Sequence, residues 1–377
     1  MSNIPPIDLK RQYQTIGADV NAAVLEVLAS GAYIGGAMVQ KFEQQFAAYM
    51  GTTECVACNS GTDALYLALR AMQIGSGDEV ITSPFTFIAT SETISAVGAK
   101  PVFVDIDPAT YNLDPAKLAA AITPRTKAIM PVHIFGKPVD LTAVMSIANQ
   151  HHIAVIEDCA QATGAEWGGK KVGNIGAFGC FSFFPTKNLG ACGDGGAITL
   201  NDSALAADLR MFREHGSRQR YYHEAIGVNS RLDALQAAVL QVKLQHLDTW
   251  NQQRTEVANR YHDLLANIPG IIPPQSISGG KCVWNQYTIR LIAPPGIDST
   301  AHRDRVRAAL MEAGVISMIY YPLPLHLQAV YRDLGYQLGS FPITEQVSNE
   351  VLSLPMFPEL TFEEQQRVVY ALKDAIA

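Results

Sequence analysis

A lysine stands in an unusually apolar stretch of the chain, the segment Ser182–Lys187 with the sequence SFFPTK. Aromatic surroundings disfavour the charged form of an amine, so we expect the pKa of Lys187 to be lowered. Such an amine can attack a carbonyl group and form a Schiff base with it. The alternative is a lysine whose ammonium group reaches solvent past the rings. The composition of the segment favours the nucleophilic lysine.

A carboxylate follows a short apolar run, in the segment Glu157-Asp158-Cys159-Ala160-Gln161. Ligands of open α/β sheets bind at the carboxyl ends of the strands. A carboxylate buried there must meet a cation or several hydrogen-bond donors. Asp158 could therefore pair with a protonated ring nitrogen of a cofactor, with Gln161 as a donor beside it. Asp158 could equally cap a following helix, and the residues alone leave both interpretations open.

Two further segments could bind anions. Asn59–Asp63 lies between a predicted strand and a predicted helix, where free N–H groups and small hydroxyls suit a phosphate. Gly227–Arg231 precedes another helix and offers Asn229 and Arg231 to a phosphate or an anionic substrate group. Ordinary helix capping and a solvated arginine explain the two segments equally well when each is taken singly. The glycines of Gly193–Gly196 would let backbone approach a ligand closely.

The chain has six cysteines, of which only Cys55 and Cys58 form a C-x-x-C pair. That pair could be redox-active or bind a metal. The segment Glu54–Cys58 has the composition of a strand, which would point the two thiols to opposite faces. A second C-x-x-C that would complete a zinc site is missing from the sequence. We therefore predict reduced, mostly buried thiols and no metal.

The elements that must position these residues alternate in type over the first 200 residues. Helices are expected at Ile16–Ala29, Gly61–Met72, Ala89–Val97, Pro115–Ile122 and Leu141–His151. Strands are expected at Cys55–Cys58, Glu79–Thr82, Pro101–Val104, Ala128–Val132 and Ile153–Glu157. Short, continuously apolar strands are typical of a mostly parallel sheet covered by helices on both faces. The fold class is therefore α/β.

The pattern changes after residue 178. Strands at Cys180–Phe184 and Gly196–Leu200 flank a glycine-rich loop, and Arg231–Ala266 indicates one long, nearly unbroken helix. A smaller α+β unit follows, with a strand at Tyr287–Leu291 and helices at His302–Ala313 and Phe362–Ala375. We predict a large domain over residues 1–250 and a small domain over residues 251–377.

Length and composition agree with a soluble two-domain protein. The 377 residues carry 28 Lys+Arg against 35 Asp+Glu, a net charge of −7, and 48% are hydrophobic. A mildly acidic chain is not built to coat nucleic acid or an anionic membrane. The first residues lack a basic segment followed by an apolar run, and no apolar stretch approaches the roughly 20 residues of a spanning helix. We expect a cytoplasmic location.

The whole chain resembles the DegT/DnrJ/StrS group of sugar-nucleotide aminotransferases. The likeness rests on several motifs that occur in one order, among them Ser30–Gly36, Ser60–Leu65, Glu157–Gln161, Ser182–Lys187, Gly193–Gly196, Asn229–Asp233 and Leu352–Pro355. Each motif alone would be weak, but their succession is specific. The resemblance implies the pyridoxal 5'-phosphate (PLP) aspartate-aminotransferase fold and a homodimer whose active sites are shared across the interface.

The resemblance also implies roles for single residues. Lys187 is similar to the lysine that forms the Schiff base and moves protons, and Asp158 to the partner of the ring nitrogen. The other residues expected at the cofactor are Gln161 at the 3′ oxygen, Phe87 stacked on the ring, Gly61, Thr62 and Ser182 at the phosphate, and Asn229 at the phosphate from the other subunit. Without the resemblance, Phe87 would be taken for an ordinary core residue. Residues expected at the substrate are Ile34, Arg231, Tyr320 and Tyr321.

Within the group, the chain is most similar to enzymes that aminate carbon 3 of UDP-linked 3-keto-N-acetylglucosaminuronic acid. Their arginine at the position of Arg231 suits a sugar carboxylate, whereas Tyr320-Tyr321-Pro322 replaces a His-Tyr-Pro. The alternatives are a dTDP-3-keto-6-deoxyhexose or a 4-keto-sugar. L-Glutamate is the expected donor, and lipopolysaccharide or O-antigen synthesis the expected pathway. A sugar dehydratase and a PLP-binding regulatory protein are the rival functions, which Lys187 and the lack of a basic cluster argue against.

Overall fold

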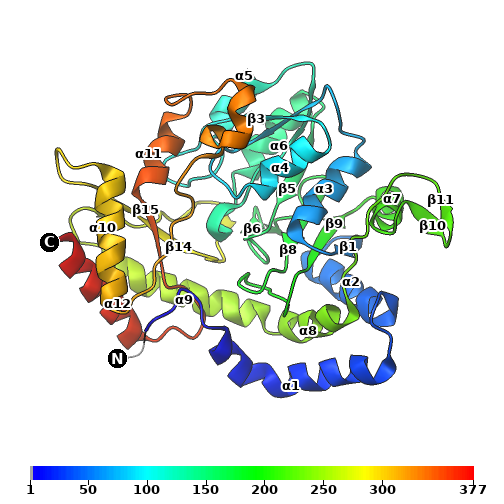
Figure 1. The fold of residues 1–377 in the computed structure, drawn as a ribbon, viewed down its shortest axis with the longest axis horizontal. Helices are drawn as coiled ribbons and strands as arrows, with labels where there is room; N and C mark the ends of the chain where they lie inside the picture. Colours follow the sequence, from blue (N-terminus) through cyan, green and yellow to red (C-terminus); the bar gives the residue numbers. More distant parts are fainter. Residues whose placement is uncertain (1–2) are drawn as a thin grey trace.

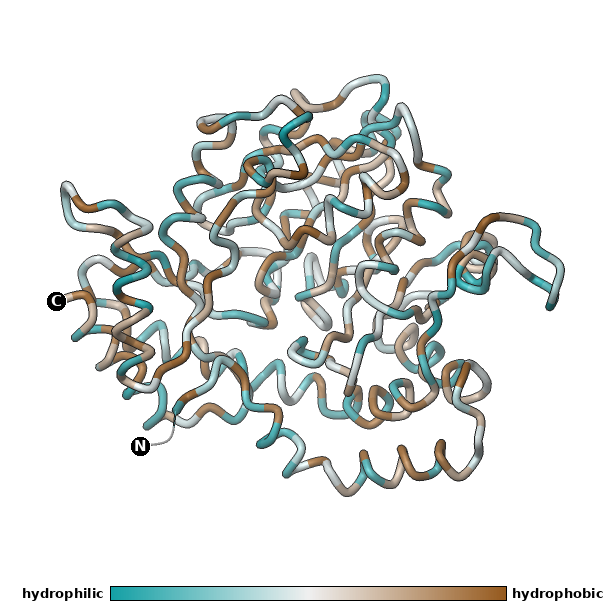
Figure 2. Tube along the Cα trace, viewed as in Figure 1, coloured by the Kyte–Doolittle hydropathy of each residue, from teal (hydrophilic) through white to brown (hydrophobic). Residues whose placement is uncertain are grey.

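A computed structural model describes residues 3–377 as an α/β fold in which both ends of the chain lie on the same side (Figure 1). Hydrophobic residues run through the centre of the fold, and hydrophilic residues are frequent on the outer helices and loops (Figure 2). Within residues 3–377, no helix combines the length and the apolar character that crossing a bilayer requires.

The central sheet has seven strands. They lie in the order β1 (Glu54–Cys58), β9 (Gly196–Leu200), β8 (Phe178–Ser182), β5 (Ala154–Asp158), β4 (Thr126–Ile129), β2 (Glu79–Thr82) and β3 (Lys100–Phe103). All run parallel except β9, which is antiparallel to its neighbours β1 and β8. The predicted mostly parallel sheet is thereby confirmed. Strand β8 ends at Ser182, two residues earlier than predicted, which leaves Phe184 and Lys187 in the loop that follows.

Both faces of the sheet are buried, because successive side chains of a strand point to opposite sides. Cys55 and Val155 belong to the hydrophobic core on one face, whereas Cys58 and Ile156 belong to the core on the other. The two thiols of the C-x-x-C pair therefore point apart, as predicted. The cysteines of the described chain are free thiols, and four of the six are buried.

Seven helices accompany these strands. They are α1 (Leu9–Ser30), α2 (Gly36–Met50), α3 (Gly61–Ala71), α4 (Ala89–Ala96), α5 (Leu118–Ala121), α6 (Leu141–Gln150) and α7 (Ser203–Arg213). Helix α1 begins earlier than predicted because the Asp8 carboxylate accepts the N–H groups of Lys10 and Arg11. The helix predicted at Pro115–Ile122 is confirmed in part. A 3-10 turn at Pro115–Lys117 comes before the four residues of α5.

The long, nearly unbroken helix predicted at Arg231–Ala266 is confirmed in large part but is interrupted once. The chain forms α8 (Ala234–Leu244) and α9 (Leu247–Leu265), with a break at Gln245 and His246. The N–H groups of these two residues bond to carbonyls three positions back, at 3.3 and 3.0 Å, which interrupts the regular ladder. The break lets α8 pack against α1 and α2 while α9 turns towards a second core, and local spacing of apolar residues carries no sign of it.

The second core lies beneath an antiparallel sheet of β12 (Ile271–Ile272), β14 (Tyr287–Leu291) and β15 (Val351–Leu354). It is covered by α9, α10 (Ser299–Glu312) and α12 (Phe362–Ile376), with α11 (Pro342–Glu350) leading into β15. The N-terminal segment joins this unit, because Ile4 is buried in the same core and pairs with Val315. Since α9 reaches from one core to the other, the domain boundary at residue 250 stays a prediction.

Short elements complete the fold. They are the sheet of β6 (Glu166–Trp167), β7 (Lys170–Lys171) and β13 (Gly280–Lys281), the hairpin of β10 (Ser217–Gln219) and β11 (Tyr222–His223), and 3-10 turns at Ile134–Gly136, Leu325–Leu327 and Ala329–Leu334. The β10–β11 hairpin projects from the body of the molecule next to α7 (Figure 1).

Candidate active site

A cavity of about 560 Å³ opens at the carboxyl ends of β5 and β8. Its walls combine loops of the central sheet with the segment Ile319–Tyr321, which comes from the C-terminal unit. Most of the predicted site residues line it, namely Gly61, Thr62, Phe87, Asp158, Gln161, Ser182, Lys187, Tyr320 and Tyr321. Segments far apart in the sequence thus converge on one space, as ligand sites of open α/β sheets do.

Lys187 is held in a tight turn after β8. Its N–H donates to the carbonyl of Phe184 at 2.9 Å, and a Cβ on Gly190 would lie 2.3 Å from the carbonyl oxygen of Pro185, so only glycine fits there. The Lys187 side chain is partly buried and lines the cavity. Burial lowers the pKa of Lys187 to about 8, with the Asp158 carboxylate opposing the shift. The amine is thereby easier to deprotonate than an ordinary lysine, as predicted from its neighbours.

Asp158 ends strand β5 and is only 4% exposed. Its Oδ1 accepts the N–H of Ala160 at 3.1 Å, and its Oδ2 accepts the hydroxyl of Thr90 at 2.8 Å. Burial raises the pKa of this carboxyl group, while the bonds from Thr90 and Ala160 and the charge of Lys187 lower it. Residues 159–165 form turns rather than a helix, so the alternative interpretation of Asp158 as a helix cap is wrong.

Gln161 is fixed by two hydrogen bonds. Its Oε1 accepts the N–H of Phe135 at 2.6 Å, and its Nε2 donates to the hydroxyl of Tyr321 at 3.1 Å. Burial raises the pKa of Tyr321, so this phenol is neutral and keeps its own proton for a further acceptor. The ring of Tyr321 lies 6.2 Å from that of Phe87, whose side chain is 55% exposed where it lines the cavity. Phe87 is therefore not an ordinary core residue.

The opposite end of the cavity is the start of α3. The Ser60 hydroxyl accepts the N–H of Asp63 at 3.1 Å, which is the helix cap considered above. This cap does not compete with ligand binding, because the earlier N–H groups, those of Gly61 and Thr62, have no acceptor inside a helix. Gly61 packs so closely on Ser182 that a Cβ at this position would lie 2.6 Å from the Ser182 Cβ. Helix start and strand end together therefore offer the donors that an anion site requires.

Three predicted residues lie outside this cavity in the described chain: Ile34, Asn229 and Arg231. Ile34 is 55% exposed on the surface, and Asn229 is exposed and pairs through its backbone with Glu214. The guanidinium of Arg231 lies 3.3 Å from the Glu214 carboxylate. A single chain therefore does not bring these three residues to the site.

Two threonines of the site carried no prediction. Thr86 and Thr90 line the cavity on either side of Phe87 and are almost fully buried, and Thr90 bonds to Asp158. Their spacing of four residues in the segment Thr86-Phe87-Ile88-Ala89-Thr90 was visible in the sequence. The contact with Asp158 spans 68 positions and had no local sign.

A cluster of His133, Glu157 and Cys159 lies behind Asp158, with possible ligand atoms within 4.8 Å of one another. The Glu157 carboxylate accepts three backbone N–H groups, at 2.7, 2.9 and 2.6 Å, and lies 3.0 Å from His133 Nε2. His133 Nδ1 accepts the N–H of Val139 at 3.1 Å. Protein groups thus satisfy this buried cluster, which anchors the end of β5.

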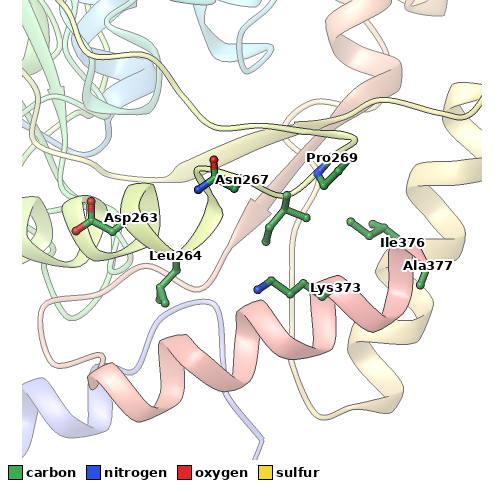
Figure 3. Close-up of a pocket in the computed structure, with 8 residues that line it drawn as sticks. Asp263, Leu264, Asn267, Pro269, Lys373, Ile376 and Ala377 are labelled. Atoms are coloured by element: carbon green, nitrogen blue, oxygen red, sulfur yellow. The ribbon is translucent and has the colours of Figure 1, made fainter.

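Another cavity, of about 520 Å³, lies between the ends of α9 and α12 (Figure 3). Its charged side chains, Asp263 and Lys373, are exposed, and it holds no cysteine, serine or histidine. It offers neither a buried amine nor a buried acid. The cavity around Lys187 is therefore the candidate active site.

Comparisons with known proteins agree with this assignment. The model of the DegT/DnrJ/EryC1/StrS aminotransferase family matches residues 14–373. The chain is 49% identical to the pleiotropic regulatory protein of Geobacillus stearothermophilus, with 97% of each chain covered. It is 44% identical to the UDP-2-acetamido-2-deoxy-3-oxo-D-glucuronate aminotransferase of Pseudomonas aeruginosa, over 94% of this chain and 95% of that one.

Two further matches come from Streptomyces venezuelae. The chain is 43% identical to its dTDP-3-amino-3,4,6-trideoxy-alpha-D-glucose transaminase, over 98% of this chain and 96% of that one. The crystal structure of S. venezuelae DesV superimposes with a TM-score of 0.94 at 43% identity, covering 99% of this chain and 98% of that one. Sequence and fold thus agree over the whole molecule.

Proposed function

We propose, since the chain belongs to the DegT/DnrJ/EryC1/StrS family of PLP-dependent sugar aminotransferases, that it moves an amino group from L-glutamate to carbon 3 of a nucleotide-linked keto-sugar. The observation that carries this proposal is that Lys187 and Asp158 line one cavity together with Phe87, whose side chain is 55% exposed. A partly buried amine of lowered pKa and a buried acid are the pair that this chemistry requires.

The residues of the cavity fit PLP at each of its functional groups. The anion site at Gly61, Thr62 and Ser182 would take the phosphate, and the face of Phe87 would stack on the ring. The Asp158 carboxylate, which already accepts two hydrogen bonds, has lone pairs left for a protonated ring nitrogen. Gln161 has a second amide proton for the 3′ oxygen. When bound, PLP supplies an electron sink that stabilises negative charge on the carbon that carries the amine.

In the proposed reaction Lys187 acts as base and acid. Its Nζ would take a proton from the α-carbon of glutamate and return one to the cofactor, and the reverse steps would aminate the sugar. A pKa of about 8 leaves part of the amine unprotonated near neutral pH, which an ordinary lysine would not offer. Asp158 would keep the ring nitrogen protonated throughout, and this charge is what makes the ring an effective sink.

The sugar would occupy the end of the cavity at Tyr320 and Tyr321. These are neutral hydroxyl groups, which suit a sugar hydroxyl or an N-acetyl group. A uronic acid would need a cation for its carboxylate, and the candidate Arg231 is already paired with Glu214. This pairing favours an uncharged 3-keto sugar, linked to UDP or dTDP, over the glucuronate that the sequence suggests. One relative is named for a dTDP-linked 3-amino sugar and another for a UDP-linked 3-oxo sugar, and both support carbon 3 as the proposed position of amination.

We also propose a homodimer, in which Asn229 and Ile34 serve the cavity of the other subunit while Arg231 stays paired with Glu214. All three lie outside their own cavity, and Ser230 bonds to Asp63 at the start of α3, close to the anion site. Asn229 is exposed, so a neighbouring subunit could receive it at its phosphate without a change of fold. Cytoplasmic location and a role in lipopolysaccharide or O-antigen synthesis stay predictions.

A coupled assay tests the proposed function. Purified protein with PLP and L-glutamate is offered UDP-3-keto-N-acetylglucosamine, its uronic acid and a dTDP-3-keto-6-deoxyhexose, and the products are read by mass. Amination of an uncharged sugar is the expected result. Amination of the uronic acid alone would contradict the argument from Arg231. Failure of glutamate to change the visible absorbance of the bound cofactor would refute aminotransfer itself and favour a PLP-binding regulatory protein.

A further inference from the structure

Two buried hydroxyl groups form a chain that ends on Asp158. The Thr86 and Thr90 hydroxyls are 3.0 Å apart, and Thr90 Oγ1 lies 2.8 Å from Asp158 Oδ2. Thr86, Thr90 and Asp158 are 3%, 1% and 4% exposed. Thr90 sits in the first turn of α4, three residues after Phe87, so one segment presents the aromatic ring to the cavity and a hydroxyl to the carboxylate.

The direction of these bonds follows from the number of protons. An ionised carboxylate only accepts hydrogen bonds, so the single hydroxyl proton of Thr90 must point to Asp158 Oδ2. The Thr90 oxygen can then only accept from Thr86, whose hydroxyl is the donor. Hydrogen bonds in such a chain polarise one another, and in a buried site each is stronger than in water. The chain therefore stabilises the charged form of Asp158.

We propose that Thr90 is a positioning residue, which holds the Asp158 carboxylate ionised and in place for the ring nitrogen of PLP. This inference rests on the proposed pairing of Asp158 with that nitrogen. The bond to Ala160 fixes Oδ1 and the bond to Thr90 fixes Oδ2, so the carboxylate cannot rotate about its last bond. Among the groups that favour its charged form, Thr90 has the largest effect on the pKa of Asp158.

Loss of the hydroxyl should act on both charge and orientation. Thr90→Val keeps the shape of the side chain but leaves Oδ2 without its donor in a buried place, where an unpaired acceptor is costly. Part of the carboxylate would then take up a proton of its own, and the ring nitrogen would lose its charged partner. We expect the Kd for PLP to rise about tenfold, which corresponds to about 1.4 kcal/mol. Thr90→Ser keeps the hydroxyl and should stay within about threefold of the wild type.

The experiment measures the protonation state of the ring nitrogen directly. Wild type, Thr90→Val and Thr90→Ser are loaded with PLP labelled with 15N in the ring, and the 15N chemical shift reports whether that nitrogen is protonated. The Kd for PLP is measured by equilibrium dialysis. Thr93→Val is the matched control, because Thr93 is equally buried on α4 but its hydroxyl bonds only to the helix carbonyls of Ala89 and Thr90.

Each outcome decides one point. A shift towards neutral pyridine with weaker PLP binding in Thr90→Val, and its reversal in Thr90→Ser, would support the proposal. An unchanged 15N shift in a folded Thr90→Val, or an equal change in Thr93→Val, would overturn it. If Thr90→Val does not fold, Thr90→Ala replaces it, because this variant also lacks the hydroxyl group whose effect on the 15N shift is measured. Asp158→Asn distinguishes the proposed function from the role of Thr90. If the ring nitrogen stays protonated in Asp158→Asn, the proposed pairing with Asp158 is wrong. If the 15N shift changes in Asp158→Asn but not in Thr90→Val, only the role of Thr90 is refuted.

Discussion

The close packing of Gly61 on Ser182 predicts the effect of adding a single methyl group at Gly61. A Cβ added to Gly61 would lie 2.6 Å from the Ser182 Cβ, 3.0 Å from its Cα and 3.1 Å from its Oγ. The first distance is roughly 0.9–1.4 Å shorter than an ordinary contact between carbon atoms. Gly61 has no positive φ, so alanine is permitted by its backbone and the cost comes from the contact alone. The Cα and Cβ of Ser182 keep their places when the side chain rotates, so a change of rotamer cannot relieve this contact.

Gly61→Ala should therefore push the start of α3 away from the end of β8. Overpacking of this kind costs about 1–3 kcal/mol of unfolding free energy. Because the N–H groups of Gly61 and Thr62 move with the helix, we expect the Kd for PLP to rise at least about tenfold as well. Both quantities are measurable, the first by urea denaturation of the protein without PLP and the second by dialysis.

A second substitution tests the cause. Ser182→Gly removes the Cβ and hydroxyl that the new methyl group would meet, so Gly61→Ala with Ser182→Gly should recover about 1 kcal/mol of stability relative to the sum of the single changes. Binding of PLP should not recover, because the hydroxyl of Ser182 is lost. Gly75→Ala is the control, since its added Cβ would meet its nearest atom at an ordinary 3.5 Å. Equal stability of Gly61→Ala and Gly75→Ala, or additive effects in the double variant, would refute this reasoning.

Three more predictions follow from the site. Lys187→Ala should keep the fold by circular dichroism but lower turnover by at least about 10³-fold, and substantial residual transamination would remove Lys187 from its role. Burial lowers the pKa of Lys187 from 10.5 to about 8, so between these pH values the unfolded chain binds more protons than the folded one. The unfolding free energy of the PLP-free protein should therefore rise with pH across this window, compared with that of Lys187→Met. Urea-denaturation measurements that give the two proteins the same pH dependence would contradict this prediction. Glu157→Gln should lower the unfolding free energy by about 2–4 kcal/mol, because an amide would replace the carboxylate that faces three backbone N–H groups and His133. A loss below about 1 kcal/mol in urea denaturation would show that the cluster tolerates a neutral side chain.

The sequence was sufficient to predict those features that depend on short segments of the chain. Short apolar runs such as Ala154–Asp158 are buried on both faces of the sheet, and this alone predicts parallel strands whose ends carry the site residues. The sequence likewise predicts the direction in which the pKa of Lys187 shifts, although the burial that lowers this pKa comes from the folded chain. Helix ends set by caps were less certain, as the early start of α1 at Asp8 demonstrates.

The tertiary structure alone decided contacts between distant segments. Thr90 reaches Asp158 and Tyr321 reaches Gln161 only because the strand order and the C-terminal unit bring them together, and a residue pattern carries no information on such order. The break between α8 and α9 has the same origin, since the two halves pack on different cores. The sequence thus determined which residues could do the chemistry, because amine, acid and anion site are properties of side chains and their neighbours. Folding decided which of them meet, because burial and distance depend on the whole chain.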